Sequence, residues 1–85
     1  MSETTPIERG KSYSDRVEEA LRSQIISGRR RPGDRLNEVE ISGELGVSRG
    51  PVREAMQRLV RDGLVHVEAH RGSFVRRLET GEITL

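Results

Sequence analysis

The chain has 85 residues and a formal net charge of +1, with 34% charged, 32% hydrophobic and 2% aromatic residues and no cysteine. A chain of this length holds one small domain and is too short for most stand-alone enzymes. Without cysteine it has neither a disulfide framework nor a thiolate zinc site, so the domain must rely on the packing of aliphatic side chains.

No apolar run approaches the roughly 20 residues that a membrane-spanning helix needs. Residues 1–13 also lack the basic patch and apolar run of a secretory signal. We therefore predict a cytoplasmic protein with no membrane partner.

The charges are unevenly distributed along the chain. Residues 1–28 sum to −1, residues 29–77 hold eleven arginines and seven acidic residues and sum to +4, and residues 78–85 sum to −2. Arginine has a planar guanidinium that suits phosphate groups and guanine edges. The middle of the chain is therefore the segment to search for a contact with nucleic acid.

Residues 1–13 mix Ser, Thr, Pro, Gly and charged residues and are predicted to form a flexible arm. A first helix is predicted over residues 15–27, with Ser14 as its N-cap and Gly28 as its stop. Ile26 lies about half a turn from the apolar stripe of this helix. It either packs under the next loop, which we favour, or contacts something outside the domain.

Residues 29–34 form a basic run that ends in turn residues, and Arg35 and Leu36 are predicted to form a short strand. A second helix is predicted from Asn37, which has capping-box spacing to Glu40, up to Gly46. Its apolar residues, Ile41 and Leu45, are four positions apart and are expected to face the core.

A third helix is predicted over residues 49–62, with Ser48 as its N-cap and Gly63 after its end. Apolar residues recur along it at helical spacing and predict one core-facing side. These residues are Val52, Ala55, Met56, Leu59 and Val60.

Alternating β-branched residues then predict a hairpin from residues 64–67 and 73–76, joined by a turn at 69–72. The predicted fold is therefore mainly α with a small β-hairpin: a winged helix-turn-helix of three helices plus a wing, over residues 14–78. Residues 79–85 are expected to begin a linker.

Gly46, Val47 and Ser48 supply what a helix-turn-helix needs between its two helices: a left-handed stop, an apolar plug and a cap. This geometry presents the first turns of the third helix outward, where Arg49 and Arg53 are spaced i, i+4 and can approach base edges in a major groove. Exposed arginines on helices are most often only solvated, but here the turn, the cap and the following hairpin favour a role in recognition.

An enzymatic site is not predicted. His66 and His70 fall in a strand and a turn, and no third His, Cys or clustered carboxylate completes a metal site with them. Ser48 has no His and Asp partners placed by the fold, and its capping role explains it. We predict no cofactor and no metal in this chain.

Four segments of the sequence resemble the N-terminal winged helix-turn-helix domain of the GntR family of bacterial transcription regulators. They are ISGRRRPGDRLNE at 26–38, LGVSRGPVREA at 45–55, DGLV at 62–65 and RGSFV at 71–75. Each is weak by itself, but the four in order at this spacing are specific. The Leu-Asn-Glu opening, the Pro-Val-Arg-Glu-Ala block and the acidic segment after residue 75 are most similar to the FadR-like branch.

The resemblance implies a double-stranded DNA partner and a role for each matching residue. Arg49 and Arg53 correspond to the two base-reading arginines of the recognition helix. The residues expected to contact the DNA backbone or to act in the wing are Arg35, Ser48, Gly50, Gln57, His70, Arg71 and Gly72.

The sequence departs from the family pattern at two positions. Val39 stands where many members have Arg, and Gly50 stands where many have a Thr that contacts phosphate. We expect both departures to weaken backbone affinity while leaving the pair of base-reading arginines intact.

The resemblance also implies properties of a longer protein. Family members continue into a C-terminal domain that dimerises and binds an effector, which in the FadR-like branch is a small carboxylate, in some members with a metal. The expected target is an inverted repeat with GT and AC half-site cores, bound by a homodimer that acts as a repressor. The main alternative is a winged helix that serves as a protein-interaction module without sequence-specific DNA binding.

Overall fold

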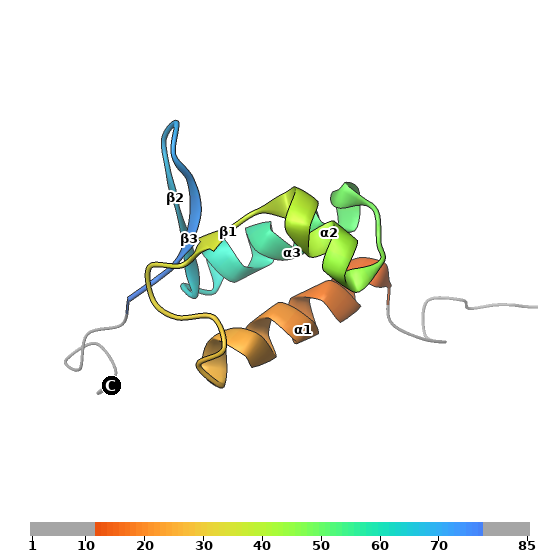
Figure 1. Cartoon of the computed structure of the whole chain (residues 1–85), viewed down its shortest axis with the longest axis horizontal. Coiled ribbons are helices and arrows are strands. Elements are labelled where there is room, and N and C mark those ends of the chain that lie inside the picture. Colours follow the sequence, from red (N-terminus) through yellow and green to blue (C-terminus); the bar gives the residue numbers. More distant parts are fainter. Residues whose placement is uncertain (1–11, 78–85) are drawn as a thin grey trace, which may run out of the picture.

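Three helices and a small sheet make up residues 12–77, the part of the chain that the computed structural model describes (Figure 1). The elements are α1 (Tyr13–Ile26), β1 (Arg35–Leu36), α2 (Glu38–Leu45), α3 (Arg49–Arg61), β2 (Val65–Glu68) and β3 (Gly72–Val75). The predicted winged helix-turn-helix is confirmed, while the expected linker at 79–85 and most of the expected arm lie outside the described residues. None of the helices within 12–77 is long and apolar enough to cross a membrane.

The core forms where α1 packs against α3, with α2 and the sheet closing its ends (Figure 1). Its side chains are aliphatic, as the composition requires. They are Val17, Leu21, Leu36, Ile41, Val52, Ala55, Met56, Leu59, Val65 and Val75. Because all three helices and all three strands contribute to this one cluster, the position of α3 is fixed from several sides at once.

Helix α1 begins two residues earlier than the sequence analysis predicted. Ser12, not Ser14, is the N-cap, and a capping box joins it to Asp15: the Asp15 N–H donates to Ser12 Oγ at 3.1 Å and the Ser12 N–H donates to Asp15 Oδ2 at 3.2 Å. Ser14 instead points inward and is 5% exposed. Tyr13, which we assigned to the arm, is the first residue of the helix.

The turn between α2 and α3 has two of its three predicted features, the left-handed Gly46 and the apolar Val47, but not a capping hydrogen bond from Ser48. Asn37 caps α2 by accepting the Glu40 N–H at 3.0 Å, and Gly46 ends it in the left-handed conformation with φ 69°. Val47 packs against the core and holds the turn down. The N-terminus of α3 is therefore fixed immediately after α2.

The hairpin of β2 and β3 is part of a three-stranded antiparallel sheet in the order β1-β3-β2. The short strand β1, which was predicted, pairs with β3. Arg35 lies opposite Phe74 and Leu36 opposite Ser73. Beyond β1 the two long strands stand out from the helices as the wing (Figure 1).

Two apolar residues are placed differently from the prediction. Ile26 is 71% exposed, so the favoured packing under the next loop is wrong. That loop is drawn toward the sheet instead, because the Gly33 N–H donates to the Val75 carbonyl and the Val75 N–H donates to the Asp34 carbonyl, both at 2.8 Å. Val60, predicted on the core face of α3, is 37% exposed at the edge of that face.

Candidate nucleic-acid interface

Arg49 is the first residue of α3, and of the two predicted base-reading arginines it is the one whose guanidinium has no ion-pair partner within residues 12–77. Arg49 is also exposed. A guanidinium without a partner keeps all five of its N–H donors available. Arg49 is therefore free to bind an anion or a base edge.

Arg53 lies one helical turn further along α3 and is in a different state. Its Nε donates to Glu38 Oε2 at 3.2 Å and its Nη2 donates to Glu38 Oε1 at 3.1 Å, so the two planar groups form a bidentate pair. The hydrogen bonds to Glu38 raise the pKa of Arg53 above its already high ordinary value. The structure thus places both predicted arginines on α3 but leaves only Arg49 unpaired.

The sequence analysis did not assign Glu38 to the site. It is the first residue of α2, and its contact with Arg53 links the starts of the two helices of the helix-turn-helix. Fifteen positions separate the two residues, so no helical spacing in the sequence could indicate this pair.

The side chains of Ser48 and Gln57 form no hydrogen bond with any residue of the described range 12–77. Ser48 occupies the N-cap position, but its side chain makes no capping hydrogen bond, which corrects the role we gave it. Gln57 and Gly50 are exposed on α3, and a Cβ built on Gly50 would meet no atom within 4 Å. The space for a hydroxyl-bearing side chain at Gly50 therefore exists, although the sequence supplies none.

The tip of the wing holds the remaining predicted residues. His70 is exposed and has a left-handed backbone with φ 64°. Arg71 pairs with Glu68 at 3.2 Å and lies over the Phe74 ring at 5.8 Å from its centroid, yet 71% of its side chain is exposed. These contacts hold the Arg71 guanidinium at the wing without covering it.

Arg35 and Gly72 were predicted separately, and the structure brings them together. A Cβ built on Gly72 would lie 2.9 Å from Arg35 Nε and 3.3 Å from Nη2. The guanidinium of Arg35 thus lies directly over the glycine at the start of β3. Arg35 is exposed and forms no ion pair within the described part of the chain, so it adds an unpaired cation beside Gly72, which pairs with Glu68 at the turn end of the hairpin.

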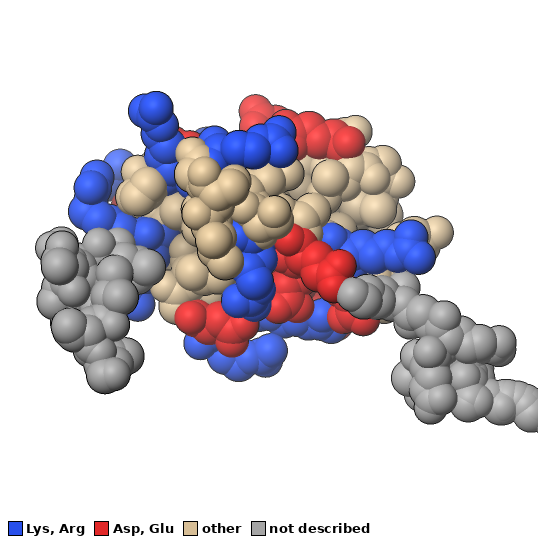
Figure 2. Space-filling model, turned by 90° about the horizontal axis from the view of Figure 1, so that it is seen from below, with Lys and Arg blue, Asp and Glu red and all other residues tan. Residues whose placement is uncertain are grey.

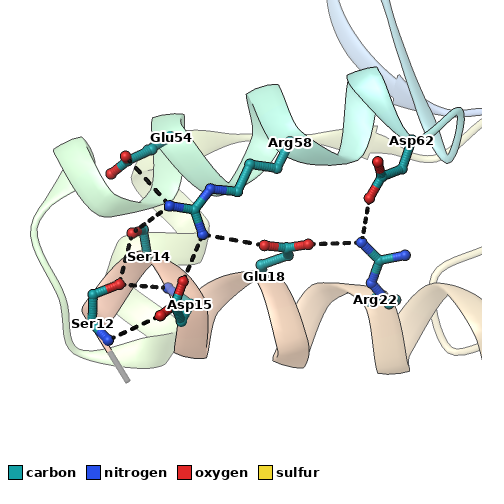
Figure 3. A network of polar contacts seen from close by, with 8 residues as sticks. All are labelled: Ser12, Ser14, Asp15, Glu18, Arg22, Glu54, Arg58 and Asp62. Carbon is teal, nitrogen blue, oxygen red and sulfur yellow. Dashed lines mark hydrogen bonds and ion pairs between the residues drawn. The ribbon is translucent and has the colours of Figure 1, made fainter. Parts of the chain in front are cut away.

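A network of ion pairs joins α3 to α1 along one edge of the interface between the two helices (Figure 3). Arg58 Nη1 donates to Asp15 Oδ1 at 2.7 Å and to Glu18 Oε1 at 3.3 Å, while its Nη2 donates to Ser14 Oγ at 3.4 Å. Arg22 Nη2 extends the network from Glu18, at 2.7 Å, to Asp62 at 2.6 Å. This network, which holds α3 against α1, was not predicted from the sequence.

These contacts shift the pKa values of both acidic residues in the same direction. The hydrogen bond from Arg58 is the largest cause that lowers the pKa of Asp15, with the Ser12 N–H as the next. The hydrogen bond from Arg22 is the main cause that lowers the pKa of Glu18. Both carboxylates are therefore ionised at neutral pH and neutralise arginines that would otherwise face solvent.

The arginines of residues 12–77 fall into two groups, those that form an ion pair with a carboxylate and those that do not. Arg22, Arg30, Arg53, Arg58 and Arg71 are each paired with a carboxylate. Seen from the side of α1, acidic and basic side chains alternate across the centre of the molecule (Figure 2). The surplus of positive charge is carried by the arginines that form no ion pair within residues 12–77, Arg35 and Arg49 among them.

His66 makes its contacts within the wing. His66 Nε2 lies 2.9 Å from Glu68 Oε2, and the His66 ring stacks on Phe74 with centroids 5.9 Å apart. No group of three His, Asp or Glu side chains within residues 12–77 is arranged to hold a metal ion.

Together, two helices joined by a left-handed glycine turn, an exposed start of the second helix and a hairpin supported by a third strand define a winged helix-turn-helix domain. The sequence matches the family described as "Bacterial regulatory proteins, gntR family" over residues 13–75. The chain belongs to the GntR family.

Curated relatives agree with this assignment. The chain is 37% identical over 78 residues to an uncharacterised HTH-type transcriptional regulator of Mycobacterium tuberculosis, covering 92% of this chain and 32% of the relative. It is 31% identical over 83 residues to the HTH-type transcriptional repressor RspR of Escherichia coli, covering 98% and 36%. The chain spans about a third of the length of these relatives.

Solved structures show the same fold. A GntR transcriptional regulator from Rhodococcus sp. RHA1 is 49% identical with a TM-score of 0.79, covering 87% of this chain and 36% of that chain. The DNA-binding domain of AraR in complex with operator ORR3 is 29% identical with a TM-score of 0.72, covering 88% of this chain and 92% of that chain. The AraR chain is thus of nearly the same extent as this one.

Proposed function

We propose that this chain is the sequence-specific DNA-binding domain of a GntR-family transcription regulator of the FadR-like branch. The observation that carries the proposal is the pair Arg49 and Arg53, held one turn apart at the outward-facing start of α3. A major groove admits such a helix, and an arginine that donates two hydrogen bonds to guanine O6 and N7 specifies that base.

The rest of the surface supports the same orientation. The unpaired cation of Arg35 and the exposed Arg71 give the wing a positive charge that suits the narrow minor groove. Ser48, directly before α3, and Gly50 and Gln57 on α3 are exposed, and we assign them contacts with flanking phosphates. The operator complex of the similar AraR domain supports binding to duplex DNA.

The wider biology follows from the family resemblance. The target is an inverted repeat with GT and AC half-sites, read by two copies of the chain whose two-fold symmetry matches that of the site. The regulator acts in the cytoplasm as a repressor, as its relative RspR is named. A further C-terminal domain binds a small carboxylate effector, in some members with a metal, and completes the dimer.

The test uses the 85-residue chain and a duplex that it selects from a randomised pool. Arg49→Ala is compared with Arg61→Ala. Both residues are exposed arginines of α3 that form no ion pair within residues 12–77, and they lie about 18 Å apart along the helix axis. Binding is measured by electrophoretic shift and fluorescence anisotropy at several salt concentrations.

We expect Arg49→Ala to lose roughly 5- to 150-fold of the preference for one guanine of the site, the range for one bidentate contact. Arg61→Ala should keep that preference. Absence of salt-sensitive binding by the wild type, or an unchanged base preference in Arg49→Ala, would contradict the proposed function and favour a protein-interaction module.

A further inference from the structure

The contact between Glu38 and Arg53 raises a question about recognition, because a base-reading arginine that is paired with a carboxylate has fewer donors to offer. Guanidinium has five N–H groups arranged along two edges. The side edge consists of Nε and one terminal nitrogen, and the end edge consists of the two terminal nitrogens, Nη1 and Nη2. Which edge the carboxylate occupies therefore decides whether Arg53 can still read a base.

Glu38 occupies the side edge. Its two oxygens accept from Nε at 3.2 Å and from Nη2 at 3.1 Å, and neither contacts Nη1. The end edge, with both N–H groups of Nη1 and the second N–H of Nη2, remains without a partner in the described structure. That edge still offers two parallel donors, which is what a bidentate contact with guanine O6 and N7 requires.

The backbone that carries Glu38 is well fixed for this task. Glu38 is the first residue of α2, directly after the N-cap Asn37, whose side chain accepts the Glu40 N–H. The positive end of the helix dipole favours a negative charge at this position. The Glu38 side chain is 29% exposed and that of Arg53 is 55% exposed, so the carboxylate is the more sheltered partner.

We propose that Glu38 is a positioning residue that holds the side edge of Arg53 and aims its end edge at the base, and so sets the specificity of recognition. An exposed ion pair contributes little to stability. Its effect here is to restrict a long side chain to one orientation before DNA arrives, which removes part of the entropy cost of binding. This inference rests on the proposed function.

Glu40 provides a matched control. It lies in the same first turn of α2, is exposed, carries the same charge and forms no ion pair within residues 12–77. Glu38→Ala and Glu40→Ala both remove one negative charge near the DNA, so both should bind duplex of random sequence somewhat more tightly. Any difference between them isolates the contact with Arg53.

The readout is the ratio of dissociation constants for the selected duplex and for the same duplex with the Arg53-dependent guanine pair replaced. That pair is identified as the one whose replacement no longer matters to Arg53→Ala. We expect Glu38→Ala to reduce this ratio by roughly two- to tenfold, the cost of ordering one long side chain. Glu38→Gln, which keeps one acceptor oxygen, should fall between Glu38→Ala and the wild type, and Glu40→Ala should equal the wild type.

A double-mutant cycle separates positioning from a general effect on the fold. In the background of Arg53→Ala, the change Glu38→Ala should no longer alter the ratio. Circular dichroism melting of each variant verifies that the chain remains folded, and the ratio is compared only between folded variants. If the melting temperature of Glu38→Ala is too low for the binding assay, Glu38→Gln takes its place.

Three results would overturn the inference. If Glu38→Ala keeps the wild-type ratio, Glu38 does not position Arg53. If Glu38→Ala binds the selected duplex more tightly than Glu40→Ala with an undiminished ratio, Glu38 instead masks Arg53. If the wild type itself shows no salt-sensitive DNA binding, the proposed function fails and the inference fails with it.

Discussion

The glycine at the start of β3 offers a direct test of how the wing is built. Gly72 has φ 119°, a backbone conformation that residues with a Cβ rarely adopt. In Gly72→Ala the new Cβ would lie 2.9 Å from Arg35 Nε, 3.3 Å from Nη2 and 3.5 Å from Cζ. The closest atoms belong to the end of a flexible side chain, so Arg35 will move away while the backbone keeps its strained conformation.

Two separate effects follow. The unfavourable φ should cost about 1–3 kcal/mol of the free energy of unfolding. In a domain of this size each kcal/mol lowers the melting temperature by about 4–8 °C. The displaced Arg35 should in addition remove one cation from the wing, which reduces the slope of log binding constant against log salt concentration by about 0.9 if Arg35 contacts one phosphate.

Gly33→Ala is the control. Gly33 also has a positive φ, 91°, but a Cβ there would meet no atom within 4 Å. Gly33→Ala should therefore lower the melting temperature and leave the salt dependence of DNA binding unchanged. Gly72→Ala should lower both, and adding Arg35→Ala to it should change the salt slope no further.

The measurements are thermal unfolding by circular dichroism and fluorescence anisotropy with a duplex at several salt concentrations. An unchanged melting temperature in Gly72→Ala would refute the argument from φ. An unchanged salt slope in Gly72→Ala, when Arg35→Ala reduces it, would refute the placement of Arg35 over the glycine.

Two further predictions concern the stability of the fold. Leu59 is 0% exposed in the core, so Leu59→Ala should lower the free energy of unfolding by about 2–5 kcal/mol in urea denaturation. Val60 is 37% exposed, so Val60→Ala should lower the free energy of unfolding clearly less. Equal losses would contradict the assigned core face of α3. Asp15 and Glu18 have lowered pKa values in the folded state, so the folded chain binds fewer protons than the unfolded chain, and stability should be present at neutral pH and decline as the pH falls below about 5. Urea midpoints that are the same at pH 7 and pH 3 would refute this.

The elements of the fold could be predicted from the sequence because their signals are local. The Asn37 cap, the left-handed Gly46 and the apolar stripe of α3 each lie within one turn of the structure they determine. The error at the start of α1 is also local. Ser12 and Asp15 have capping-box spacing. The structure forms this capping box, so the helix begins after Ser12 and not after Ser14, the N-cap that we predicted.

The site could be predicted only in part. The positions of Arg49 and Arg53 on α3 follow from the helix-turn-helix pattern, but the pairing of Arg53 with Glu38 depends on how α2 lies against α3. The same holds for Arg58 and Asp15, which are 43 positions apart. Local spacing indicates ion pairs only within a helix, between residues three or four positions apart.

Helix α3 shows how the same residue type serves three purposes on one element. Arg58, whose side chain is 26% exposed, is committed to α1 through Asp15 and Glu18 and so orients the helix. Arg53 is committed along one edge, to Glu38, and keeps the other edge free. Arg49 has no commitment within the described residues. From Arg58 through Arg53 to Arg49, the number of paired carboxylates therefore falls toward the N-terminus of α3, and the number of free N–H donors rises. Arg61, at the other end of α3, also has no ion pair within residues 12–77. The net charge of +4 over residues 29–77 does not reveal these differences.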